Sequence, residues 1–184
     1  MYKVMEWLED EANGLAILGY VVLAAVLVVA FQQMVHATLE NWHIIVVPTA
    51  TTHEEFLARY PNPFKYMGRF EFADIVAMSP LFEESLFRLL PLAFVIMFVS
   101  TRPMVVFTTT LCLAVLFGAI HPYDIYGRAG VAIAGIFFGT AFLKCGGMKK
   151  RFVKGWFCAV TAHGISNLFV LLYGLWEHFV MNGT

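Results

Sequence analysis

The chain has 184 residues, of which 60% are apolar and only 14% are charged. Soluble domains average about 25% charged and about 45–50% apolar residues, so this composition excludes an ordinary soluble enzyme and indicates an integral membrane protein. The net charge of −1 argues against a nucleic-acid partner, because no basic stripe is present to neutralise phosphates. The three cysteines lack the paired spacing of a disulfide framework or a zinc knuckle.

The apolar segments predict an all-α, polytopic transmembrane helix bundle of about five spans, or six if the second span is split. Spanning segments are expected to be helices, because an open sheet edge cannot satisfy its backbone groups in hydrocarbon. The predicted spans are about 14–36, 72–99, 104–121, 129–145 and 154–179. No repeat, low-complexity tract or linker divides the chain, so we expect residues 1–184 to form one membrane-embedded domain.

The first predicted span contains an uncharged run, Gly14–Phe31, that is long enough to cross a bilayer. Acidic residues precede it and no small-residue cleavage site follows, so it is expected to remain as a span rather than to be removed as a signal peptide. The next segment, Leu39–Glu71, contains three prolines and is predicted to be a loop. Its apolar stretch His43–Val47 is too short to span and is expected to lie at the membrane interface.

A dense group of basic residues lies between the fourth and fifth predicted spans. Its members are Lys144, Lys149, Lys150, Arg151 and Lys154. The positive-inside rule places this group in the cytoplasm, and five spans then place the N-terminus on the same side.

Three charged residues lie within the second predicted span: Glu83, Glu84 and Arg88. A charged side chain at the centre of a membrane helix costs about 2.5–3.5 kcal/mol on insertion scales. These side chains are therefore expected to face the protein interior or a water-filled cavity, where charged groups usually serve chemistry or transport. Glu84 and Arg88 are four residues apart and can pair, whereas Glu83 points about 100° away and is left free to act as a base. A buried ion pair that only fixes helix packing is the competing interpretation.

The third and fifth predicted spans carry the other polar side chains that could serve chemistry. Phe117 and His121 share a face at the end of the third span, and His163 and Asn167 share a face of the fifth. Such side chains can simply tie helices together in a membrane. Together with the acidic residues of the second span, they also supply what is needed to activate water and to stabilise a tetrahedral intermediate.

The three motifs, in this order, resemble those of the CAAX-protease and bacteriocin-processing family, which includes the eukaryotic CAAX prenyl endopeptidase and the bacterial Abi proteins. Glu-Glu-x-x-x-Arg occurs at Glu83, Glu84 and Arg88, Phe-x-x-x-His at Phe117 and His121, and His-x-x-x-Asn at His163 and Asn167. The resemblance covers about residues 72–179 and leaves the span 14–36 as an N-terminal addition.

The resemblance implies a role for each motif. Glu83 and His121 would activate the attacking water, His163 and Asn167 would form the oxyanion hole, and Glu84, Arg88 and Phe117 would support the site. No cofactor is favoured. The alternative is zinc held by Glu83, His121 and His163, since two His and one Glu can bind this metal with an open position for water.

The expected function is hydrolysis of a peptide bond in a membrane-associated peptide or protein that is lipidated or anchored at its C-terminus. The expected surroundings are membrane lipid, in a bacterial cytoplasmic membrane. The alternative function is a non-catalytic membrane immunity or adaptor protein that retains the fold. A proton-coupled transporter would also explain buried Glu and His, but the chain shows no internal repeat and no paired half-helices.

Overall fold

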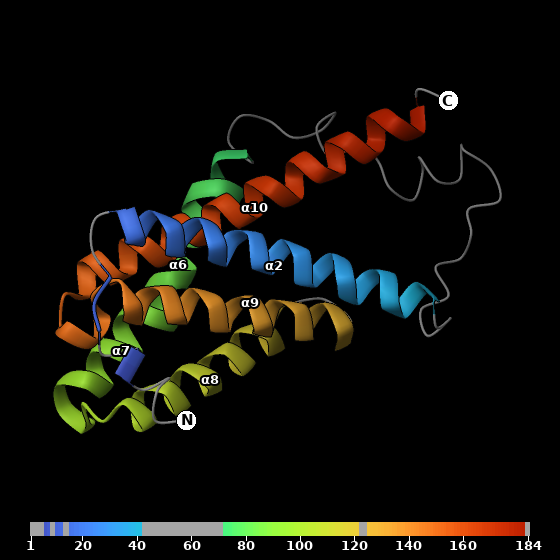
Figure 1. Ribbon diagram of the computed structural model, residues 1–184. Helices are drawn as coiled ribbons and strands as arrows, with labels where there is room; N and C mark the ends of the chain where they lie inside the picture. The colour runs from blue at the N-terminus through green and yellow to red at the C-terminus, as the bar shows by residue number, and fades with distance from the viewer. Residues whose placement is uncertain (1–5, 8–9, 13–14, 42–71, 122–124, 183–184) are drawn as a thin grey trace.

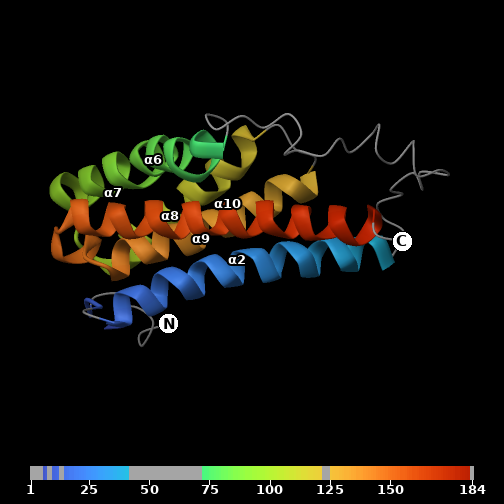
Figure 2. The same ribbon diagram turned by 90° about the horizontal axis from the view of Figure 1, so that it is seen from above.

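The computed structural model of the chain describes residues 6–7, 10–12, 15–41, 72–121 and 125–182, and all statements about structure below concern these residues. Within them every regular element is helical, as the sequence predicted. The long helices are α2 (Leu15–Asn41), α8 (Pro103–Ile120), α9 (Ile125–Lys144) and α10 (Phe152–Asn182). They run lengthwise beside one another in a single bundle (Figures 1 and 2).

A further helix between Asp74 and Val99 alternates α-helical turns with wider π-helical turns. Its segments are η1 (Asp74–Met78), α6 (Ser79–Glu84), η2 (Ser85–Leu89), α7 (Leu90–Phe94) and η3 (Val95–Val99). Pro80 and Pro91 lie within it and lack the N–H that continues an α-helical ladder, which accounts for local departures from the regular pattern.

The predicted bundle is confirmed, with differences at the helix ends. Helix α2 continues to Asn41, so residues 39–41 extend the first helix rather than begin a loop. The predicted interfacial stretch His43–Val47 lies outside the described residues. By length and apolar character, three of the described helices can each cross a membrane: Pro103–Ile120, Gly127–Lys144 and Phe152–Tyr173. Helix α2 contributes a shorter apolar stretch, Leu15–Phe31, and the helix between Asp74 and Val99 carries the charged motif in short segments.

Two apolar clusters hold the bundle together. In the first, residues of α2, α9 and α10 meet around Val28, Phe138 and Ala162. In the second, α7 and η3 pack against α8, α9 and α10 around Leu92, Phe142 and Ala159. Large apolar side chains such as Leu86, Phe94 and Phe157 point outward instead, as expected for helices that are surrounded by lipid.

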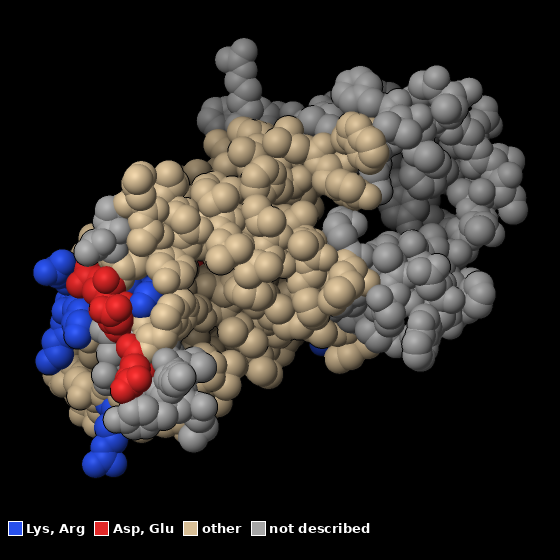
Figure 3. Space-filling model, viewed as in Figure 1, with Lys and Arg blue, Asp and Glu red and all other residues tan. Residues whose placement is uncertain are grey.

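The N-terminal segment packs against the turn between α9 and α10. The buried Lys144 ammonium donates to the backbone carbonyls of Trp7 and Asp10, and it lies 4.6 Å from the centre of the Trp7 ring. Glu11 accepts hydrogen bonds from Lys154 (2.5 Å) and Arg151 (3.1 Å). Charged side chains accordingly gather at this end of the molecule (Figure 3). The predicted basic group and the described N-terminal residues 6–7 and 10–12 therefore lie at the same end of the bundle.

We expect the ion pairs of Glu11 to stabilise the fold in a pH-dependent way. The hydrogen bond from Lys154 is the main cause that holds the pKa of Glu11 below its usual value of 4.5. A lowered pKa in the folded state means that the stabilisation is present above about pH 4.5 and is lost as the pH falls through the lowered pKa. Glu11→Gln should lower the melting temperature of the purified protein at pH 7 by about 1–3 °C, and this effect should shrink as the pH falls below 4.5.

The matched control is Glu6→Gln, since Glu6 is exposed and makes no side-chain ion pair within the part of the chain that the structure describes. It should leave the melting temperature unchanged across this pH range. A Glu11→Gln effect that persisted unchanged at low pH would contradict the assignment.

Candidate active site

The alternating α- and π-helical turns give the helix between Asp74 and Val99 a repeat close to four residues. Its fully buried positions are Pro80, Glu84, Arg88, Leu92 and Ile96, each four residues after the last. A regular α-helix has 3.6 residues per turn, so a four-residue repeat would drift by about 40° at every step. The wider i→i+5 turns remove this drift. Glu84 and Arg88 consequently stay on the face that points into the bundle.

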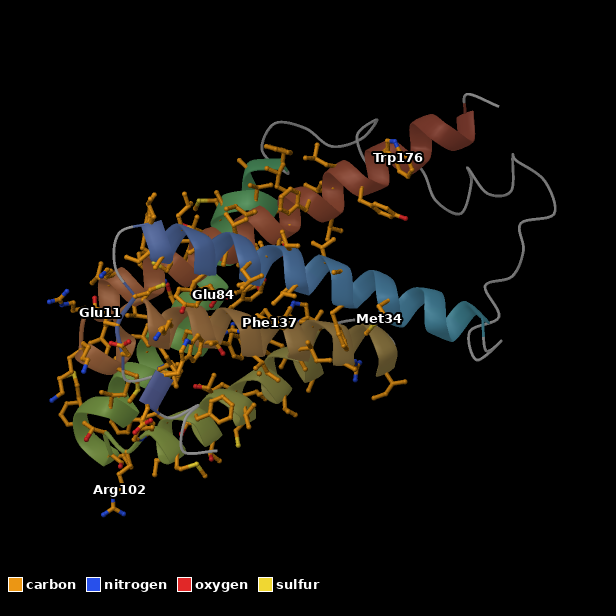
Figure 4. All side chains as sticks on the ribbon, viewed as in Figure 1. Glu11, Met34, Glu84, Arg102, Phe137 and Trp176 are labelled. Carbon is orange, nitrogen blue, oxygen red and sulfur yellow. The ribbon has the colours of Figure 1, made fainter. Side chains whose placement is uncertain are left out.

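Glu84 and Arg88 form a buried ion pair, with Arg88 Nη1 3.1 Å from Glu84 Oε1. The predicted pairing of Arg88 with Glu84 is thereby confirmed. Arg88 Nη2 also donates to the Gly135 carbonyl at 3.2 Å, and its guanidinium lies 4.4 Å from the centre of the Phe117 ring. A Cβ atom at position 135 would lie 2.9 Å from Arg88 Nη2, so the glycine permits this close approach. Glu84 is enclosed by the helices (Figure 4).

His163 joins the two acidic side chains of the motif. Its Nδ1 lies 2.9 Å from Glu84 Oε1, and its Nε2 lies 3.8 Å from Glu83 Oε2. The imidazole stacks on Phe138, with the ring centres 4.5 Å apart. Glu84 is paired with Arg88 and an ionised carboxylate only accepts hydrogen bonds, so we assign the hydrogen to Nδ1 of His163. His163 is thus held in one orientation, with Nε2 directed toward Glu83.

Glu83 differs from its neighbour in both exposure and partners. Its side chain is 27% exposed, whereas that of Glu84 is fully buried. The Ser79 hydroxyl donates to Glu83 Oε1 at 2.6 Å. Glu83 is therefore not as free as the spacing suggested, but its closest partner is a neutral hydroxyl rather than the Arg88 cation.

His121 follows the last residue of α8 and lies against Phe117. The two ring centres are 4.7 Å apart, and His121 Nδ1 lies 2.6 Å from the Phe117 carbonyl. The Phe117 ring also meets His163 edge-on, with a centre-to-centre distance of 6.0 Å. Phe117 therefore contacts both motif histidines as well as Arg88.

Asn167 contacts the backbone of the helix between Asp74 and Val99, which is called the acidic helix below because it carries Glu83 and Glu84. Its Nδ2 donates to the Ile75 carbonyl at 2.8 Å. One turn earlier on α10, Gly164 lies so close to η1 that an added Cβ would be 2.4 Å from the Val76 carbonyl oxygen. The spacing His163-x-x-x-Asn167 thus does two things: His163 contacts the acidic side chains, and Asn167 contacts the backbone of the helix that carries them.

The alternative zinc ligands Glu83, His121 and His163 are only partly brought together. Glu83 and His163 approach each other, and the contact of His121 Nδ1 with a backbone carbonyl is one that metal-binding histidines also make. Within the described ranges, no group of three or more His, Cys, Asp or Glu side chains is placed to hold a metal ion. We therefore derive no catalytic step through zinc.

The structure brings five of the seven motif residues into direct contact. These are Glu83, Glu84, Arg88, Phe117 and His163. His121 joins the group through Phe117, and Asn167 through η1. Sequence reasoning missed Ser79, Gly135 and Phe138. Ser79 could have been found from its four-residue spacing to Glu83, whereas no local pattern points to the other two.

Comparison with protein families identifies the chain. Residues 68–169 match the type II CAAX prenyl endopeptidase Rce1-like family, and this segment contains all three motifs. The chain belongs to that family. The resemblance drawn from the motifs is thus confirmed. Searches of curated proteins and of solved structures give no match.

Membership of the Rce1-like family fixes the general class of activity. The protein is a CAAX-type intramembrane endopeptidase whose substrate is a peptide or a protein. The apolar helices agree with its place in a membrane. The prediction of an integral membrane protease is confirmed at this level.

Proposed function

We propose that this protein cleaves a lipidated or C-terminally anchored peptide within a bacterial cytoplasmic membrane, using Glu83 as the general base and no metal ion. The proposal rests on the division between two adjacent acidic residues. Glu84 is fully buried and is engaged by both Arg88 and His163. Glu83 is partly exposed, and its Oε2 faces His163 rather than a permanent cation. One carboxylate is thus structural, and the other can accept a proton.

The reaction begins when a water molecule attacks the carbonyl carbon of the scissile peptide bond. Glu83 accepts a proton from this water, assisted by His121, which directly follows α8. The electron pair of the carbonyl moves to its oxygen, which becomes an oxyanion. When the intermediate collapses, the C–N bond breaks and Glu83 returns the proton to the leaving amine.

His163 and Asn167 are the proposed donors to this oxyanion. Nδ1 of His163 is held by Glu84, so Nε2 donates to the oxyanion when the ring is an imidazolium. One hydrogen of the Asn167 amide is used by the Ile75 carbonyl, and the amide carries a second. Asn167 therefore has one hydrogen for the backbone of η1 and one for substrate.

The proposed substrate follows from the family and from the apolar surroundings of the site. The family is that of the type II CAAX prenyl endopeptidases, and a prenyl group is a lipid that can tether a peptide to a membrane. The helices that carry the site present large apolar side chains outward, including Leu86, Leu90 and Phe94. A membrane lipid environment is thus part of the proposal, and a tethered peptide would reach the site from within it.

Replacing Glu83 by Gln should abolish hydrolysis while leaving the fold intact. The amide keeps the size of the side chain and still accepts the Ser79 hydrogen bond, but it cannot take a proton from water. Activity would be measured in liposomes with a farnesylated, internally quenched peptide that ends in a CAAX sequence. Asn167→Ala should retain a slow reaction, because loss of one oxyanion donor typically costs about 10²–10³ in rate.

The matched control is Glu11→Gln, which makes the same chemical change outside the site, beside Lys154 and Arg151, and should leave the rate unchanged. Full activity of Glu83→Gln would overturn the assignment of the base. A wild-type protein that binds the reporter without cleaving it would instead favour the non-catalytic immunity or adaptor function.

Metal removal tests the metal-free part of the proposal separately. After exhaustive chelation, the purified protein should cleave the reporter at its original rate, and elemental analysis should find less than one zinc per active chain. Activity that is lost on chelation and restored by added zinc would contradict the proposal and favour the site at Glu83, His121 and His163.

A further inference from the structure

Five hydroxyl side chains in these helices share one hydrogen-bond pattern, from which Ser79 departs. In a membrane helix, a Ser or Thr hydroxyl commonly donates to the carbonyl four residues earlier. Ser85 does so to Leu81 at 2.7 Å, and Thr109, Thr110, Thr140 and Thr161 do the same at 2.8–2.9 Å. Ser79 instead donates forward, to Oε1 of Glu83 at 2.6 Å.

The reason for this departure lies in the carbonyl that Ser79 would otherwise use, which is that of Ile75. The backbone N–H of Ser79 bonds to the Asp74 carbonyl in the π-helical turn η1. The next residue, Pro80, has no N–H to offer. The backbone of residues 79 and 80 therefore offers no N–H to the Ile75 carbonyl. Asn167 Nδ2 donates to this carbonyl instead, from α10, at 2.8 Å. The Ser79 hydroxyl is thereby left to Glu83.

The bond from Ser79 separates the two oxygens of Glu83. Oε1 is held by the hydroxyl, and Oε2 is turned toward His163 Nε2 at 3.8 Å. A hydroxyl orients the carboxylate without adding a charge beside it. The four-residue repeat of this helix places Ser79 and Glu83 on one face, one helical turn apart.

We infer that Ser79 is a positioning residue that aims Oε2 of Glu83 at the attacking water, and that Asn167 supports it by occupying the Ile75 carbonyl. This inference rests on the proposed function of Glu83 as the base. Ser79 lies outside the seven motif positions, so it extends the site by one residue. Its effect on hydrolysis passes through Glu83.

The test compares Ser79→Ala, which removes the hydroxyl, with Ser79→Thr, which keeps it. A misaimed catalytic group typically costs on the order of 10²-fold in rate, so Ser79→Ala should lower kcat by about 10- to 100-fold with KM unchanged. Ser79→Thr should restore most of kcat. The reporter is the farnesylated CAAX peptide, used with full-length protein in liposomes. The control Thr109→Val removes an exposed hydroxyl of the usual pattern and should leave kcat unchanged.

A spectroscopic measurement keeps the inference testable if Ser79→Ala folds poorly. The Glu83 carboxylate band is obtained as the infrared difference between the wild type and Glu83→Gln. It should shift in Ser79→Ala, because a short hydrogen bond to Oε1 is lost, and it should stay in place in Ser79→Thr.

Three results would overturn the inference. They are an unchanged kcat in Ser79→Ala, a loss that Ser79→Thr fails to restore, and a carboxylate band that does not respond to Ser79→Ala. Failure of the proposed function itself would look different, since Glu83→Gln would then be active. If Glu83→Gln is inactive while Ser79→Ala has normal kcat, only the role of Ser79 is refuted.

Discussion

The buried ion pair between Glu84 and Arg88 is the interaction on which the arrangement of the site depends. A charged group in a water-free interior is costly unless a partner of opposite charge and further hydrogen bonds compensate it. Here Arg88 lies 3.1 Å from Glu84, bonds to the Gly135 carbonyl and stacks on Phe117, so α8, α9 and the acidic helix meet at one guanidinium. Glu84 in turn fixes His163 of α10. Four helices thus share one buried network.

The geometry of the acidic helix gives the two adjacent carboxylates, Glu83 and Glu84, different surroundings. The π-helical turns keep Glu84 and Arg88 on the buried face, and the adjacent residue, Glu83, falls on a partly exposed face. π-Helical turns are uncommon and often occur at functional sites. In this protein they also leave the Ile75 carbonyl to Asn167, so the same backbone feature connects the helix to α10. Local backbone geometry therefore determines which carboxylate is buried in the ion pair and which is partly exposed and proposed as the base.

Much of this could be predicted from the sequence, because charged residues in apolar helices have few ways to be accommodated. The helical bundle, the Glu84–Arg88 pair and the family follow from composition, four-residue spacing and the order of the motifs. The contacts of Gly135 and Phe138 could not be predicted, since they depend on how α9 packs against its neighbours. The bond from Asn167 to a backbone carbonyl also escaped prediction, because it requires a π-helical turn that side-chain periodicity does not reveal. The extension of α2 to Asn41 could not be predicted, because the apolar pattern ends before these polar residues.

The central claim, that Arg88 exists to neutralise a buried Glu84, is tested most directly by thermal unfolding of Arg88→Leu with and without Glu84→Gln. Removing one partner of a buried pair typically costs about 3–5 kcal/mol, because the other charge is left uncompensated. The single variant should therefore be strongly destabilised, and Glu84→Gln should restore a large part of that loss by removing the remaining charge. A double variant that is no more stable than Arg88→Leu alone would contradict the account.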